Sequence, residues 1–286
     1  MKALYSGVSG MRSHQTKMDV IGNNIANVNT NGYKTQRATF RDIYYQTISN
    51  PGQASDGIGG TNSSQVGYGA QIASVDTIHT LSGYSPTNKA TDIYINGEGY
   101  LKVQDASGNM YYTRYGALNF DSEGQLVDSN GSIVLGLTGD VKAADNVTIT
   151  EASLKKIKID INDFKNITIN SDGTITGVGN NPSETDTYNK VTTLGLIAVA
   201  TVPNQAALQL DGSSYYTAGN NTGTITYHAA GLGGSGAIVT GGLEMSNVDL
   251  ANEFSDMIIT QRGYQANTKI ISVVDQMLEE LVNLKR

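Results

Sequence analysis

Apolar residues recur every seven positions near the start of the chain. The repeat consists of Leu4, Met11, Met18 and Ile25, with Val8, Ile21 and Val28 in neighbouring positions of the same helical face. A sustained seven-residue apolar repeat is typical of helices that wind around other helices. The pattern therefore predicts a helix over about the first 30 residues, with one apolar stripe for packing.

A second repeat of the same kind occupies the C-terminal end. It consists of Leu250, Met257, Tyr264, Ile271 and Leu278, with Phe254, Val274 and Leu281 in support. Asn247 and Asp249 precede it, and both residue types can cap a helix N-terminus. If only one such helix were present, packing on the core of the chain's own β domain would explain it better. A matched pair at the two chain ends favours a coiled coil.

The middle of the chain has the shorter period of β-strands. Ile93 and Ile95, and then Leu101 and Val103, alternate as half-buried strands do, and Asn-Gly, Ser-Gly and Glu-Gly pairs separate such segments. The run "TTLGLIAVATV" is continuously apolar and predicts a buried strand. The predicted fold class is therefore α+β, with terminal helices that form a coiled-coil base and a central all-β domain. The predicted parts are a helical domain of residues 1–30 plus 248–286, an extended connecting segment of residues 31–75, and a β-rich domain of residues 76–242.

Charge and composition exclude several partners. The formal net charge is −7, which argues against nucleic acid, because phosphate binding requires clustered Lys and Arg. Residues 1–40 carry +4, residues 41–242 carry −8 and residues 243–286 carry −3, so the two ends have opposite sign. No stretch approaches the 18 apolar residues of a membrane span, and the first residues lack the apolar run of a cleaved secretory signal. A chain exported unfolded without a cleaved signal would look the same.

Candidate chemistry is sparse. The chain has no Cys, and its three His residues are isolated from nucleophiles and from any metal-ligand spacing. "GLGGSG" at 231–236 matches a dinucleotide-binding spacing but lacks the strand and helix that such a site requires. We therefore predict no catalytic, cofactor-binding or metal residues and no enzyme activity. A secreted β-rich glycan-binding protein or enzyme with helical ends stays open as an alternative.

Both chain ends resemble a known family. "LYSGVSGM", "MDVIGNNIANVNTNGYK" and "LEMSNVDLANEFSDMIITQRGYQANTKIISVVDQMLEELVNLKR" are similar to the flagellar axial (rod and hook) proteins, and most of all to the hook protein of Gram-positive bacteria. "TDIYINGEGYLKV" and "YTRYGALNFDSEGQLV" resemble the β domain of the same family. The resemblance covers both ends and the first half of the middle. The distal rod protein of the basal body shares both end motifs and is the alternative.

This resemblance implies a structural subunit without catalytic activity or cofactors. Such subunits polymerise helically into a tube, with the paired terminal helices inside and the β domain outside. As a hook, the tube would be a flexible joint that transmits torque from rod to filament. The implied partners are further copies of the chain, the distal rod protein, the hook cap protein, the hook-filament junction protein and the flagellar type III export apparatus. The implied location is the extracellular flagellum, reached without a cleaved signal peptide.

The resemblance also implies roles for the residues that follow the first helix. Residues from Asn27 to Asn31 would end the inner helix, and Gly32 would supply the positive φ that a chain reversal requires. Tyr33 and Phe40 would anchor the extended segment that leads to the β domain. An ordinary helix stop would give the same local structure.

Overall fold

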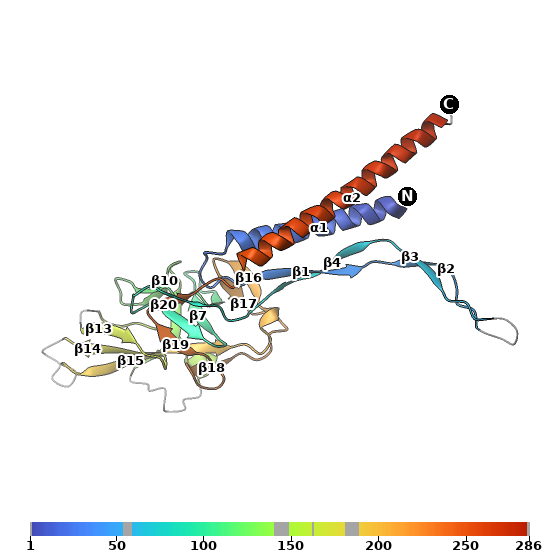
Figure 1. Cartoon of the computed structure of the whole chain (residues 1–286). Helices are drawn as coiled ribbons and strands as arrows, with labels where there is room; N and C mark the ends of the chain where they lie inside the picture. Colours follow the sequence, from blue (N-terminus) through green and yellow to red (C-terminus); the bar gives the residue numbers. More distant parts are fainter. Residues whose placement is uncertain (1, 54–58, 140–148, 162, 181–188, 285–286) are drawn as a thin grey trace. The chain divides into compact units, whose positions relative to one another are not determined.

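The computed structural model describes residues 2–53, 59–139, 149–161, 163–180 and 189–284. The chain divides into two compact units (Figure 1). Unit 1 contains Met1–Val28, Thr35–Ile78 and Val248–Arg286, and unit 2 contains Asn29–Lys34 and His79–Asn247. The segment expected to connect helices and β domain, residues 31–75, is thus shared between the units.

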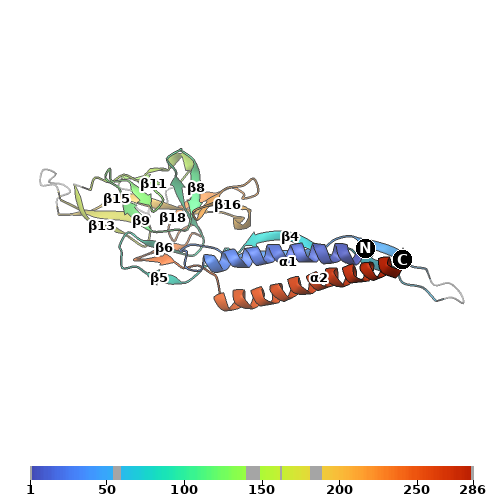
Figure 2. The ribbon, with the colours of Figure 1, turned by 90° about the horizontal axis from the view of Figure 1, so that it is seen from above.

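Two terminal helices dominate unit 1. Helix α1 (Lys2–Ala26) and helix α2 (Leu250–Leu284) lie side by side (Figure 2). They run in opposite directions, because the Asn24 amide hydrogen-bonds Glu253 whereas Gly7 faces Ile271. Asp249 caps α2, since its carboxylate accepts hydrogen bonds from the first backbone N–H groups of the helix. The predicted pairing of helices from the two chain ends is confirmed.

Four strands complete unit 1 over its described residues. They are β1 (Gln36–Asp42), β2 (Tyr45–Ser49), β3 (Ser64–Gly67) and β4 (Ala70–Thr77). β1 pairs with β4 and β2 pairs with β3, both antiparallel, and α1 lies against β1 and β4. The buried Ser13 hydroxyl donates to the Ala70 carbonyl at 3.2 Å across that contact. The segment expected to be an extended connector therefore contains paired strands.

The described residues of unit 2 form antiparallel strands and two short 3₁₀ helices. The strands are β5 (Tyr84–Pro86), β6 (Ile93–Asn96), β7 (Tyr100–Gln104), β8 (Met110–Thr113), β9 (Leu118–Phe120), β10 (Leu126–Asp128), β11 (Ile133–Thr138), β12 (Lys155–Lys156), β13 (Phe164–Ile169), β14 (Thr174–Gly179), β15 (Val191–Thr201), β16 (Gln209–Gly212), β17 (Tyr215–Thr217), β18 (Thr226–Ala229), β19 (Ala237–Thr240) and β20 (Gly242–Glu244). The 3₁₀ helices are η2 (Glu151–Ser153) and η3 (Gln205–Ala207). The main sheet runs in the order β13-β14-β15-β11-β7-β8-β17-β16. Two smaller pairs, β19 with β6 and β20 with β5, lie outside it. The predicted α+β class is confirmed.

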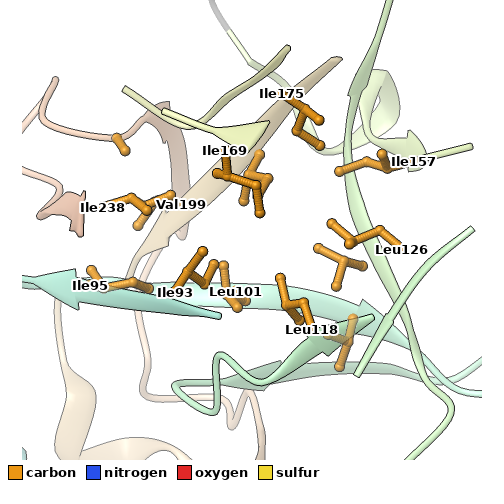
Figure 3. Packing of buried hydrophobic residues seen from close by; sticks show 14 of the residues in the cluster. Ile93, Ile95, Leu101, Leu118, Leu126, Ile157, Ile169, Ile175, Val199 and Ile238 are labelled. Carbon is orange, nitrogen blue, oxygen red and sulfur yellow. The ribbon is translucent and has the colours of Figure 1, made fainter. Parts of the chain in front are cut away.

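The core of unit 2 is rich in Ile, Leu and Val, whose branched side chains suit a pleated surface. Figure 3 shows these side chains converging on one interior, with Ile93 and Leu101 among them. A second buried cluster contains Tyr100 and Tyr216. β7 is therefore buried on both faces, and its Lys102 is buried as well. The expectation of a half-buried strand here is wrong, because the other face of β7 belongs to this second buried cluster.

Candidate assembly site

The residues predicted to form the helical seam fall into a covered and an exposed group. In α1, Ile21 is buried, and the half-buried ones are Leu4, Val8, Met11, Met18 and Ile25. In α2 the half-buried ones are Met257, Tyr264, Ile271 and Val274. The exposed ones are Leu250, Phe254, Leu278 and Leu281. The structure of one chain brings only the covered group into its interior, and the role of both groups in assembly stays a prediction.

Small and polar residues complete the contact between α1 and α2. A methyl group at Gly10 would lie 2.9 Å from the Asn267 side-chain nitrogen, so glycine allows the close approach here. Thr260 is buried in the same helix as Asn267. Our reading of the heptads missed both polar residues, because it followed apolar side chains alone. Their position in the repeat could have revealed them. Thr260 and Asn267 follow Met257 and Tyr264 by three residues, which is the spacing of the second core position in a heptad.

Asn24 joins α1 to β1 and α2. Its buried side-chain nitrogen donates to the Gln36 carbonyl at 2.8 Å and to Glu253 Oε1 at 3.0 Å, and its oxygen accepts from the Gln36 N–H at 3.0 Å. Burial raises the pKa of the Glu253 carboxyl, while the hydrogen bonds from Asn24 and Thr35 act in the opposite direction. Sequence reasoning gave Asn24 no role. Its only signal is an amide three residues after Ile21, inside an apolar stripe.

The chain reverses after α1 at Gly32. The Asn27 N–H donates to the Asn23 carbonyl at 3.2 Å, and the Asn27 side-chain amide donates to the same carbonyl at 2.9 Å. Gly32 has φ of +72°, a conformation that favours glycine. Its N–H donates to the Glu244 carbonyl at 2.9 Å, so the reversal is held by the last strand of unit 2.

The other predicted connector residues occupy different surroundings. Asn31 and Tyr33 are half-buried, and the Tyr33 N–H donates to the Thr30 carbonyl at 3.2 Å. Phe40 lies in β1, where its ring centroid is 5.7 Å from that of His14 on α1. Phe40 is 41% exposed, so it is only partly held within unit 1.

A buried ionic cluster, here called the Glu244 cluster, consists of Lys34, Arg114 and Glu244 in unit 2. Glu244 accepts from Lys34 Nζ at 2.7 Å and from Arg114 Nε at 2.8 Å, and all three side chains are at most 2% exposed. Lys34 also donates to the Thr80 carbonyl at 2.6 Å, and Arg114 donates to the Gly97 carbonyl at 2.7 Å. The cluster therefore ties together segments that lie far apart in the sequence. Sequence reasoning assigned these residues no role, although each lies within a motif quoted above.

A histidine next to the Glu244 cluster has a strongly lowered pKa. Burial, followed by the charges of Lys34 and Arg114, lowers the pKa of His79 from 6.5 to about 4. Its Nδ1 lies 2.8 Å from the Tyr100 hydroxyl. Burial and the Arg114 charge also lower the pKa of Lys34, against the opposing effect of Glu244. His79 is therefore neutral near pH 7.

Within the described ranges, no group of His, Cys, Asp or Glu side chains converges in a way that could hold a metal ion. Neither helix, over its described length, is long and apolar enough to cross a membrane.

An exposed apolar surface on α2, here called the α2 surface, is the candidate assembly site. Its members are Phe254, Ile258, Ile259, Ile270, Val273, Met277, Leu278, Leu281, Val282 and Leu284. Water-exposed apolar residues in such number along one helix mark an interaction site. Unit 1 therefore pairs two terminal helices, and α2 carries exposed apolar side chains along its length.

Three family models match this chain. "Flagella basal body rod protein" matches residues 4–34, "Flagellar hook protein FlgE/F/G D1 domain" matches residues 94–177, and "Flagellar basal body rod FlgEFG protein C-terminal" matches residues 239–284. The chain is 42% identical to the flagellar basal-body rod protein FlgG of Bacillus subtilis (strain 168), over the whole of both chains. It is 34% identical to the FlgG of Borreliella burgdorferi, over all of this chain and 99% of that one. It is also 28% identical to the flagellar hook protein FlgE of the same organism, over the whole of both.

The chain therefore belongs to the family of flagellar rod and hook proteins. It is a structural component of the flagellum and not an enzyme, as the sequence analysis predicted. The comparisons support the distal rod protein, the alternative of the sequence analysis, better than the hook protein.

Proposed function

We propose that this chain is the distal rod subunit of the flagellar basal body. The observation that carries the proposal is the agreement of identity and length with rod proteins. The 42% identity to the Bacillus subtilis rod protein extends over an alignment of 287 residues, for a chain of 286. The alignments to the hook proteins of Borreliella burgdorferi and Treponema pallidum extend over 449 and 470 positions, so these hook proteins contain long segments without a counterpart in this chain of 286 residues.

One organism provides a matched comparison. The rod protein of Borreliella burgdorferi is 34% identical over 289 residues, whereas its hook protein is 28% identical over 449. Differences between lineages do not enter this comparison, because both proteins come from one genome. It favours the rod, and it replaces our initial expectation of a flexible hook that joins rod to filament.

The subunits are proposed to form a helical homopolymer through their terminal helices. The α2 surface supports this, because its ten large apolar residues are between 40% and 83% exposed in the described part of the chain. The predicted seam residues divide accordingly, with Ile271 and Met257 inside the chain's own helix pair and Phe254 and Leu281 available to other copies. The partners proposed are further copies, the adjoining rod and hook proteins and the flagellar export apparatus, and the proposed location is the flagellum outside the cytoplasm.

Deletion of the gene tests the proposal. Electron micrographs of basal bodies from the deletion strain should show a shortened rod, because the missing subunit is proposed to build the distal part of the rod. A complete rod that lacks only its hook would contradict the rod assignment and restore the hook. Expression of the intact chain from a plasmid should restore the complete rod, which excludes an effect on neighbouring genes.

A further inference from the structure

An apolar groove follows α1 in unit 1. Two adjoining hollows of about 400 and 370 Å³ share Tyr5, Ser9 and Ile43 in their walls. Tyr44 and Tyr68 also line the first hollow, and the second continues along α1 beyond Arg12. We call the two together the α1 groove. All residues that line it come from α1 or from residues 43–72, so it lies away from the side of α1 on which α2 packs.

The C-terminal end of α2 extends beyond α1. Gly7 of α1 faces Ile271, and α1 begins only five residues earlier, at Lys2. The two helices are antiparallel, so residues of α2 beyond about 276 have no residue of α1 beside them. The seam of α2 nevertheless continues at the same spacing with Leu278 and Leu281, which are 44% and 62% exposed. A helix-packing stripe thus runs past the end of its own partner.

We propose that this overhanging end of α2, residues 277–284, occupies the α1 groove of a second copy of the chain. The inference rests on the proposed function, because it requires a polymer. A helical polymer needs two different and complementary surfaces on each subunit, and the overhanging end and the α1 groove are such a pair.

Size and charge both fit this occupant. The overhanging end is about 12 Å long at 1.5 Å per residue, and the groove follows α1 from Tyr5 to Thr16, which is about 18 Å by the same measure. Arg12 lines the groove, and Lys2 lies over the ring of Tyr68, 5.7 Å from its centroid. Each residue of a helix is turned by about 100° from the one before it, which places Glu279 beside the apolar stripe that contains Leu278 and Val282. The positive charges of Lys2 and Arg12 at the groove therefore attract the acidic C-terminal end of α2 more than its middle.

The absence of cysteine from the whole chain allows a direct test. Ser9→Cys and Val282→Cys would be introduced together into the full chain, in cells that carry no other copy of the gene. The neighbour of Ser9, Gly10, faces Asn267, which is fifteen residues before Val282. The two sulfurs are then about 20 Å apart within one chain, far beyond disulfide reach, so only a bond between copies can form. Mild oxidation of isolated basal bodies should give a ladder of covalent multimers on non-reducing gels.

A matched control uses Ser9→Cys with Phe254→Cys. Phe254 is exposed and apolar like Val282, and it lies thirteen residues before Asn267, at a comparable distance from Ser9 within one chain. This pair should stay monomeric. Multimers from the control pair but not from the Val282 pair would overturn the inference and assign the groove to the middle of α2. No multimers from either pair, in cells that swim, would also overturn it while leaving the rod assignment intact.

Charge reversal gives a second test that needs no cysteine. Arg12→Glu should reduce swimming, and adding Glu279→Arg should restore it, whereas adding the exposed Gln261→Arg in the middle of α2 should not. Equal rescue by both, or rescue by neither, would contradict the inference. If the gene deletion leaves a complete rod, the proposed function itself fails, and that outcome is separate from these.

Discussion

Replacing Glu244 with Gln is expected to destabilise unit 2 strongly while changing its shape very little. The carboxylate accepts hydrogen bonds from Lys34 and Arg114 and is 1% exposed. A glutamine of the same size removes the negative charge, and its amide group must point at one of the two cations. Two buried positive charges would then face each other without a counter-ion, which is the costly way to break a buried ion pair.

The size of this loss in the free energy of unfolding depends on the hydrogen bonds that Lys34 and Arg114 retain in the variant. Lys34 retains the Thr80 carbonyl, and Arg114 retains the carbonyls of Ile95 and Gly97. These contacts satisfy donors but do not neutralise charge. Removing one partner of a buried pair costs about 3–5 kcal/mol, and the retained hydrogen bonds place this change near 4 kcal/mol. That is a large part of the roughly 5–15 kcal/mol by which a folded domain is stable.

Urea unfolding of the purified full chain measures this loss. The chain has no Trp and 16 Tyr, so near-ultraviolet circular dichroism reports the buried tyrosines of unit 2. Glu151→Gln is the matched control, since Glu151 also pairs with a buried lysine, Lys102, but is 69% exposed itself. Water can replace that carboxylate, and the control should lose about 1 kcal/mol or less. A loss below about 1 kcal/mol for Glu244→Gln would refute the claim that this charge holds the cluster together.

Three further results are expected. Asn24→Ala should destabilise unit 1 by about 3 kcal/mol in thermal unfolding followed by helical circular dichroism, because it leaves the Gln36 backbone groups unpaired. Unit 2 should lose about 2 kcal/mol as the pH falls from 6.5 to 4, since folded His79 has a pKa of about 4 and unfolding takes up a proton in this window; His79→Gln should flatten the dependence. Ile271→Asp should abolish rods while unit 2 stays folded, whereas the exposed Gln276→Asp should assemble normally.

Much of unit 1 could be predicted because its determinants are local. A seven-residue apolar spacing fixes which side of a helix is apolar, whatever that helix packs on. Met257, Tyr264 and Ile271 therefore belong to a half-buried stripe whose spacing alone revealed it. The positive φ at Gly32 follows in the same way, since few residues other than glycine adopt that conformation readily.

For the strands, the local sequence pattern does not determine how much of each strand is buried. Alternation in Leu101 and Val103 indicates a strand, but it cannot say whether the other face meets water or a second layer. Tyr100 is buried against Tyr216 of β17, and Lys102 against Tyr227 of β18, and both strands lie more than 100 residues further along the chain. Pairing across more than 100 residues leaves no trace in a short window of sequence.

By itself, the sequence determined the two terminal helices, the reversal at Gly32 and the family. Only the tertiary structure decided that Lys34, Arg114 and Glu244 meet. Each is an ordinary charged residue in its own segment, and a charge becomes a buried, high-energy group only when the fold removes water from it and supplies a counter-ion. The same holds for Asn24, whose amide completes the backbone pairing of a strand that begins twelve residues later. Periodicity is a property of neighbours along the chain, whereas desolvation is a property of neighbours in space.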